Sequence, residues 1–196
     1  MDATEWDARY AETELAWGVE PNRFLAPEVD GLEPGRALDL AAGEGRNALW
    51  LAEQGWTVTA VDFSSVGIDK ARRIAAERKV DVTWIVHDVV TFEVEPGAFD
   101  LVIVFYLHIA PIDMKAVLAH ATEALNQGGT LLIVGHDRAN LASGVGGPQD
   151  PAILHDTEEI TAELGALVIE KAQRVTRPVE GSERDAIDTL VKAVKP

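Results

Sequence analysis

From residue 36 onward, the chain alternates between short apolar runs and segments whose apolar residues recur at helical spacing. The apolar runs predict strands at 37–41, 56–61, 80–86, 101–105 and 130–135. The helical patterns cover 46–54, a segment that begins at Ser64 or Ser65 and carries Ile68, Ala71 and Ala75, and a segment from Pro111 to Leu125. Such alternation is typical of a parallel sheet that helices cover on both faces.

The run 101–105 is unbroken rather than alternating, which predicts a central strand buried on both faces and next to the first strand. Residues 136–155 contain too many glycines and prolines for regular structure, so a long loop is expected there. Asp156 and Glu159 then form a predicted capping box. Because long loops in compact domains are often functional, residues 136–155 are of interest for the site.

Two further strand patterns, 166–175 and 186–194, close the sequence, and the short turn between them predicts an antiparallel hairpin. The predicted fold class is therefore α/β: a single Rossmann-like, doubly wound domain with a mostly parallel seven-stranded sheet and a C-terminal antiparallel hairpin. Residues 1–35 lie outside the alternating pattern and are rich in aromatic residues. We expect them to form a helical cover segment on a main domain of residues 36–196.

Composition narrows the functional classes. With 196 residues, 47% of them hydrophobic, the chain can bury the core of one domain. Its formal charge of −16 argues against nucleic acid, whose binding needs clustered Lys and Arg. The longest apolar run, 101–107, is too short to span a membrane, and the acidic N-terminus is unlike a signal peptide. We expect a cytoplasmic protein, a monomer or homodimer, with no nucleic-acid or membrane partner.

Metal and thiol chemistry are not expected. The chain has no cysteine, which excludes disulfides, thiolate zinc sites and cysteine nucleophiles. Its His and carboxylate residues do not have a spacing typical of a metal site, so the prediction is no metal.

The turn after the first predicted strand has the pattern of a nucleotide-cofactor turn. Gly43-x-Gly45-x-x-Ala48 satisfies the relaxed dinucleotide fingerprint, and Asp62 follows as a candidate ribose ligand. Glycine is needed there because a residue without a β-carbon can take φ > 0 and lets the backbone approach a ligand closely. The helix that follows points its free N–H groups at the same place.

Charge distinguishes between two cofactors that fit this turn. Asp39 in the strand and Glu44 between the glycines flank the place where the pyrophosphate of NAD(P) would lie, and like charges at that range repel. S-adenosylmethionine (SAM) has no phosphate but carries a sulfonium and an ammonium group, so an acidic turn suits it better. Arg46 offsets part of the repulsion, which keeps an NAD(P)-dependent oxidoreductase as an alternative.

Residues 39–48 (Asp-Leu-Ala-Ala-Gly-Glu-Gly-Arg-Asn-Ala), the following Trp50-Leu51-Ala52 and the C-terminal hairpin together resemble a class I SAM-dependent methyltransferase. The resemblance covers essentially the whole chain. Within this superfamily, the stretch 39–52 is similar to the small-molecule branch that includes tellurite-resistance and thiopurine methyltransferases. The resemblance implies methyl transfer from SAM to a small-molecule acceptor, with S-adenosylhomocysteine (SAH) as product. One departure is Ala41, which stands where the family usually has its first glycine. We expect it to alter packing rather than abolish cofactor binding.

The resemblance also implies which residues contact the cofactor. Asp39 and the Gly43–Gly45 backbone would hold the methionine end, Asp62 the ribose, and Asp88 with the following N–H the adenine. The full predicted set is Trp17, Asp39, Ala41, Gly43, Gly45, Arg46, Asn47, Asp62, Phe63, Ser64, Asp88, Val89 and Phe105. For each acid the alternative is a helix cap or a structural turn, and for each aromatic residue it is core packing. For Trp17 that means docking on the sheet edge instead of a cation–π contact with the sulfonium.

Acceptor-side candidates follow the predicted fourth and fifth strands, at the edge where open α/β sheets bind ligands. Tyr106 or His108 could orient an acceptor, and His108 or His136 could take its proton. His136 with Asp137 is a candidate base pair, and Asn140 with the glycine-rich loop a candidate lid. The case for an acceptor-side role is weaker for His155.

The acceptor itself is not specified by these residues. A thiol or a chalcogen oxyanion would need no base, whereas an alcohol or phenol would. Each of these acceptors stays an alternative, and so does an ordinary structural role in the loops for the candidate residues.

A non-catalytic protein of the same fold is a further alternative. Such a protein would bind SAM or a partner without turnover, and the sequence does not exclude it because the acceptor-side residues are the least distinctive ones. The oxidoreductase is less favoured because a nicotinamide site has no equal need for Asp88 or for the C-terminal hairpin.

Overall fold

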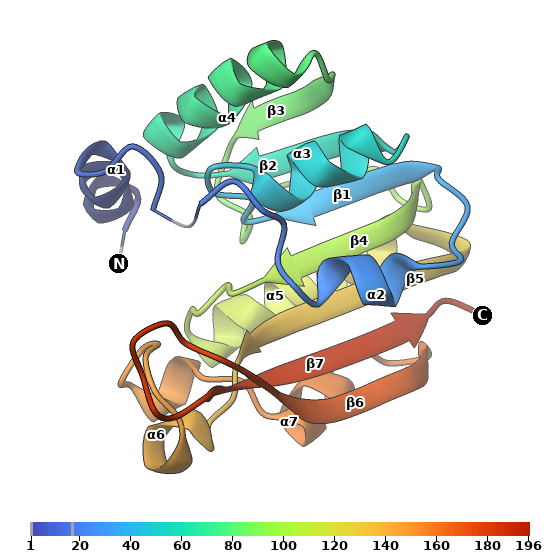
Figure 1. Cartoon of the computed structure of the whole chain (residues 1–196). Coiled ribbons are helices and arrows are strands. Elements are labelled where there is room, and N and C mark those ends of the chain that lie inside the picture. Colours follow the sequence, from blue (N-terminus) through green and yellow to red (C-terminus); the bar gives the residue numbers. More distant parts are fainter. Residues whose placement is uncertain (1, 17) are drawn as a thin grey trace.

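One mixed sheet of seven strands organises the computed structural model, which describes residues 2–16 and 18–196 (Figure 1). The strand order is β3-β2-β1-β4-β5-β7-β6, and only the pairings of β7 are antiparallel. The strands are β1 (Arg36–Leu40), β2 (Thr57–Asp62), β3 (Val82–Val86), β4 (Phe99–Phe105), β5 (Leu125–His136), β6 (Val168–Arg177) and β7 (Ala186–Val194). The predicted fold class is confirmed, including the central strand, since β4 pairs with β1.

Helices cover both faces of the sheet. The helices are α1 (Ala3–Ala11), α2 (Leu25–Val29), α3 (Arg46–Glu53), α4 (Ser65–Arg78), α5 (Pro111–Ala124), α6 (Asn140–Ser143) and α7 (Thr157–Ala162), with a 3₁₀ turn η1 (Pro151–Ile153). One apolar core joins α2 and α3 to the sheet, and a second joins α5 and α7 to its other face. In Figure 1, α2 and α3 lie in front of the sheet and α5 lies behind it.

Local sequence signals place the helix starts. Ser64 caps α4, because its Oγ accepts the Gly67 N–H at 3.0 Å, and Pro111 occupies the first turn of α5. Asp156 caps α7 by accepting backbone N–H groups, but the side chain of Glu159 pairs with Arg138 instead of returning to the cap. The predicted capping box is therefore wrong in its second half.

Two predicted boundaries need correction. Residues 136–155 are not structureless, because the glycines gather in 144–147 and leave room for α6 before them and for η1 after them. β5 begins at Leu125 rather than at 130, since the two glycines at 128 and 129 continue the chain into the strand without breaking it.

The carboxyl ends of the parallel strands define the edge where the site is expected. Their arrowheads point to the left in Figure 1, where α1 and the segment around α6 also lie. α1 packs on α4, and α2 lies on the face of the sheet. Across the described residues, no helix is both long and apolar enough to cross a membrane.

Candidate cofactor and acceptor site

The turn after β1 has a backbone that favours glycine. Gly43 and Gly45 have φ of 57° and 77°, and Gly45 is the N-cap of α3. A Cβ on Gly43 would lie 2.7 Å from the Tyr10 hydroxyl, and one on Gly45 would lie 2.5 Å from the Trp84 ring. Ala41 has φ of 66°, a left-handed conformation that costs a non-glycine residue about 1–2 kcal/mol. Besides the packing change predicted at Ala41, which stays a prediction, this position carries backbone strain that the sequence does not reveal.

Asp39 is a buried carboxylate at the end of β1. It is 1% exposed, and its Oδ2 has no hydrogen-bond partner among the described residues. Burial raises its pKa to about 7, the charge of Asp62 adds to the rise, and Arg46 opposes it. A buried, unpartnered carboxylate oxygen beside a glycine turn is a ready partner for a cationic or N–H donor group on a ligand.

Asp62 ties the first two strand ends together. Its Oδ2 accepts the Gly43 N–H at 2.7 Å and its Oδ1 accepts the Ser64 N–H at 2.8 Å, which leaves each oxygen a second lone pair. Burial raises its pKa, the two backbone N–H groups oppose the rise, and the nearby charge of Asp7 adds to it. Together with Asp39, this makes three carboxylates around one turn.

The N-terminal segment lies over this turn. The Asp7 carboxylate accepts the Ser64 hydroxyl at 2.5 Å, and the side chain of Asn47 accepts the Asn22 N–H at 2.8 Å. Ser64 and Asn47, both predicted to contact the cofactor, are thus bonded to the cover segment. Trp17, the remaining prediction for this segment, lies outside the described residues.

Glu44 does not face the turn as its sequence position suggested. Its Oε1 lies 2.9 Å from the Nζ of Lys70, and its Oε2 accepts the Ala16 N–H at 2.8 Å. Lys70 is itself buried and donates to the carbonyls of Tyr10 and Thr13. The Glu44 charge is therefore neutralised within the protein, and the acidity of the turn comes from Asp39, Asp62 and Asp7 instead.

The remaining predicted cofactor contacts, including those to adenine, are spread between surface and core. Asp88 is exposed, and its Oδ1 accepts the Val90 N–H at 2.9 Å, which is the turn-capping alternative. Val89 and Phe105 are buried in the two apolar cores, and Phe63 is half-buried. The structure thus brings Asp39, Gly43 and Asp62 together and leaves Asp88 at the rim.

Tyr106 begins the acceptor side, directly after β4. It has φ of 55°, and its hydroxyl donates to Asp188 Oδ2 at 2.8 Å. Arg177 Nε donates to the same oxygen at 2.7 Å and to the Tyr106 hydroxyl at 3.1 Å. Burial raises the pKa of Tyr106 to about 12, and Asp188 adds to the rise, so this phenol stays protonated. Burial lowers the pKa of Arg46, and the charge of Arg177 lowers it further while that of Asp39 opposes the change, so Arg46 lies between the turn and this side.

His108 is held as a neutral ring. Its Nδ1 lies 3.0 Å from the Ile153 carbonyl and its Nε2 lies 3.3 Å from the His136 backbone N–H, so Nδ1 carries the proton. Burial and the neighbouring His155 lower its pKa to about 3. Both nitrogens are thus occupied by the protein, which favours a structural role for His108 over the predicted proton transfer.

His136 lies at the end of β5 with a partner that sequence proximity did not suggest. Its Nδ1 is 3.1 Å from Asp188 Oδ1, although the N–H does not point straight at the oxygen. Asp137 points away, to Arg174 at 2.9 Å and to the Thr189 hydroxyl at 2.7 Å. The predicted pairing of His136 with Asp137 is therefore wrong, because neighbours on a strand point to opposite faces.

Asn140 supports the glycine-rich loop. Its side chain donates to the Gly146 carbonyl at 2.8 Å and accepts the Ile187 N–H at 2.8 Å. The loop then returns so that a Cβ on Gly147 would lie 2.7 Å from the ring of His136. Asn140, predicted to face the acceptor, thus fixes the loop against β7.

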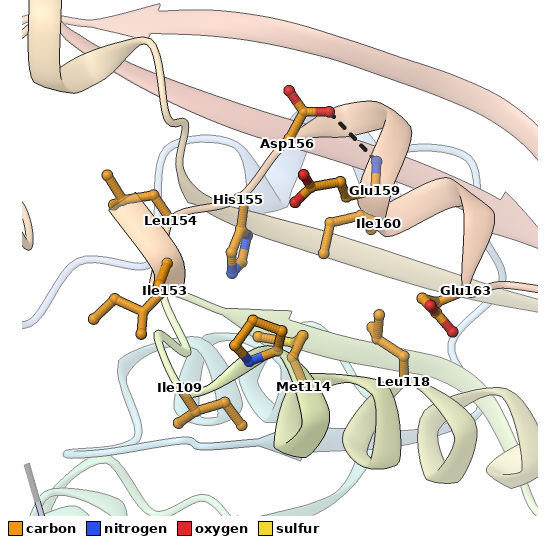
Figure 2. A pocket seen from close by; sticks show the side chains of 12 residues that line it. Ile109, Met114, Leu118, Ile153, Leu154, His155, Asp156, Glu159, Ile160 and Glu163 are labelled. Atoms are coloured by element: carbon orange, nitrogen blue, oxygen red, sulfur yellow. Dashed lines mark hydrogen bonds between the residues drawn. The ribbon is translucent and has the colours of Figure 1, made fainter. Parts of the chain in front are cut away.

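A cavity of about 80 Å³ lies between α5 and the segment 152–163. Figure 2 shows the apolar side chains of Met114, Leu118, Ile153 and Ile160 around it, with the His155 ring directed toward α5. His155 Nε2 lies 2.9 Å from the Leu107 carbonyl, and burial lowers the pKa of the ring. The cavity has room for a small apolar group. No group of three or more His, Asp or Glu in 2–16 and 18–196 could hold a metal ion.

Sequence reasoning missed the carboxylate and the cation of the β6–β7 hairpin. Asp188 is fully buried, and burial alone would raise its pKa, but His136, Arg177 and Tyr106 hold the pKa below its usual value. The available signal was a polar pair, Asp188-Thr189, inside an otherwise apolar strand. Lys70, the buried partner of Glu44, was also missed, because its position within a helical segment gives no comparable signal.

Comparisons with known proteins agree with this geometry. A family model described as a methyltransferase domain matches residues 37–129. The chain is 33% identical over 130 residues to the tRNA (uracil(54)-C(5))-methyltransferase of Pyrococcus horikoshii, over 53% of this chain and 31% of that one. It is 31% identical over 117 residues to the 2-heptyl-1-hydroxyquinolin-4(1H)-one methyltransferase of Mycobacteroides abscessus, a match that covers 58% of this chain and 52% of that one. The chain thus spans about half or less of the length of these relatives.

A solved structure shares the fold over almost the whole chain. TehB from Haemophilus influenzae has a TM-score of 0.76 at 15% sequence identity, over 98% of this chain and 67% of that one. At that identity the likeness concerns the fold alone. It extends to the hairpin of β6 and β7, which lies beyond the segment that the family model matches.

Proposed function

Since this chain carries a class I SAM-dependent methyltransferase domain, we propose that it transfers the methyl group of SAM to a small-molecule acceptor and releases SAH. The observation that carries the proposal is the Asp39 carboxylate, which is buried beside the glycine turn with an oxygen that has no partner. The acceptor would bind at the carboxyl ends of β4 and β5, beside Tyr106 and His136.

The residues of the turn fit SAM. The free oxygen of Asp39 would accept the ammonium group, and Asp62 would accept the ribose hydroxyls through its remaining lone pairs. The N–H groups at the start of α3 would face the carboxylate. When bound, SAM supplies a methyl group on a positively charged sulfur. Asp39, Asp62 and Asp7 create a negative environment in which that charge is favourable and a pyrophosphate is not, which argues against NAD(P).

The acceptor side supports a small molecule rather than a nucleic acid. The formal charge of −16 disfavours a phosphate backbone, even though one relative acts on tRNA. Another relative acts, by its name, on a hydroxyquinolone, which is a small molecule. The role of this chain's own residues is to hold the acceptor in line with the methyl group, which by itself accounts for much of the rate of such a transfer. A cytoplasmic location and a monomeric or homodimeric state remain predictions.

Thermal unfolding with SAM, SAH, NAD and NADP in parallel tests the cofactor. A ligand at about 100 times its Kd stabilises the fold by about 2.7 kcal/mol, so SAM and SAH should each raise Tm by several degrees. The variant Asp62→Ala should lose that shift, and the exposed Asp81→Ala should keep it. A shift with NAD or NADP alone would refute the proposal, and binding of SAH without any methyl transfer from labelled SAM would favour a non-catalytic protein.

A further inference from the structure

We propose, resting on the methyl transfer proposed above, that His136 is the base that removes the acceptor's proton, that Asp188 positions it, and that the acceptor is a hydroxyl compound, a phenol or an alcohol. The proposal depends on the contacts between the end of β5 and the β6–β7 hairpin.

The surroundings of Asp188 favour its ionised form. It lies opposite His136 in the antiparallel pairing of β5 and β7 and is fully buried. Tyr106 and Arg177 both donate to its Oδ2, at 2.8 and 2.7 Å, which leaves Oδ1 directed to the imidazole at 3.1 Å. Because a buried anion needs donors, a small rotation of the His136 ring would complete a hydrogen bond from Nδ1 to Oδ1.

The other nitrogen of His136 is available to a ligand. No partner of Nε2 is found in the described part of the chain, and the side chain is 12% exposed. The ring is fixed on two sides, stacked on His108 at 5.3 Å between centroids and edge-on to Tyr106 at 5.1 Å. With the proton on Nδ1 facing Asp188, Nε2 carries the lone pair and has no partner among the described residues that would compete for an acceptor's proton.

The neighbouring groups do not compete for the role. Both nitrogens of His108 are bonded to backbone atoms, and the Tyr106 hydroxyl donates to Asp188. His155 is buried and bonded to the Leu107 carbonyl. Nδ1 of His155 also has no partner among the described residues, but it is buried out of reach of a ligand, whereas the His136 side chain is partly exposed.

The proposed transfer consumes one acceptor hydroxyl and one SAM. The acceptor oxygen forms a bond to the methyl carbon while the carbon–sulfur bond breaks and its electron pair returns to sulfur, giving SAH. The hydroxyl proton moves to His136 Nε2 and then to solvent. A thiol or a chalcogen oxyanion is already a good nucleophile near neutral pH and would make such a base unnecessary. A positioned base contributes about 10²–10⁴-fold for a group that must lose its proton.

Imidazole nitrogen NMR of the SAH-bound protein tests the positioning role without an acceptor. We expect His136 to be mainly the Nδ1–H tautomer in the wild type, and to shift toward Nε2–H in Asp188→Ala and Asp188→Asn, with SAH affinity unchanged. The exposed His87 is the matched control, and its signals should not change. An Nε2–H tautomer in the wild type, or an unchanged tautomer in both variants, would overturn the proposal. If SAH does not bind at all, the proposed function fails instead.

Transfer from labelled SAM to phenol, 4-nitrophenol, a long-chain alcohol and thiophenol tests the acceptor class. We expect product from a hydroxyl compound, with kcat reduced at least tenfold in His136→Asn and in Asp188→Asn while KM for SAM stays the same. The loss should be smallest for 4-nitrophenol, which is already largely ionised. Transfer to thiophenol alone, transfer to none of the hydroxyl compounds, or full activity of His136→Asn would overturn the assignment.

Discussion

Replacing Asp39 with Asn tests the central feature of the cofactor site, because it removes a buried charge and keeps the shape of the side chain. The pKa of Asp39 rises from 3.8 to about 7 on folding, mainly through burial and also through Asp62. The folded state therefore holds a proton that the unfolded chain has already lost between pH 4 and 7. Stability from this group is present at low pH and is lost as the pH rises through that window.

The magnitude follows from the shift. About three pH units at 1.36 kcal/mol each correspond to up to about 4 kcal/mol that ionised Asp39 costs the folded protein above pH 7. Relative to their difference below pH 3.8, we expect Asp39→Asn to gain about 1 kcal/mol in free energy of unfolding over the wild type at pH 4.5 and up to about 4 kcal/mol at pH 8. Asp81→Asn on the surface is the matched control and should give no pH-dependent difference.

The assay has two parts. Urea unfolding at pH 4.5, 6 and 8 measures stability, and calorimetry with SAH measures affinity. The ligand's ammonium group needs the charged form of Asp39, so wild-type affinity should rise between pH 6 and 8, and Asp39→Asn should bind about 10–100-fold more weakly. A variant that is less stable at pH 8, or one that binds SAH as tightly as the wild type, would refute the reasoning.

Four further outcomes are expected. Ala41→Gly should relieve the left-handed strain and add about 1 kcal/mol, seen as a Tm higher by about 2–4 °C; an unchanged Tm would contradict the strain. Lys70→Met should cost about 3–5 kcal/mol in urea unfolding, because Glu44 stays buried without its partner; Lys79→Met, on the exposed end of α4, is its control. Asp62→Ala should weaken SAH binding at least tenfold by calorimetry, and equal affinity would remove the ribose role. His108 has a folded pKa of about 3, so the wild type should lose about 2 kcal/mol relative to His108→Gln between pH 7 and 5; parallel pH curves would contradict this.

Local pattern was sufficient for much of the fold and part of the site. The alternation of strands and helices, the β6–β7 hairpin and the glycine turn depend on periodicity and on backbone conformations that few residues adopt, and both can be read along the chain. Asp39 and Asp62 were predicted for the same reason, because each ends a strand at a known edge of the sheet. The backbone of Ala41 could not be predicted, since an alanine gives no sign that its φ is positive.

The partners of the charged residues were decided only in three dimensions. Glu44 and Lys70, or His136 and Asp188, are distant in sequence and meet because strand order and helix packing bring them together. Periodicity and the positions of glycine and Asp are enough to specify a Rossmann-like α/β domain with an acidic glycine turn. Which carboxylates remain free for a ligand depends on the folded structure. A buried carboxylate is paired or unpaired according to which distant residues pack against it, and the sequence around it does not show those residues.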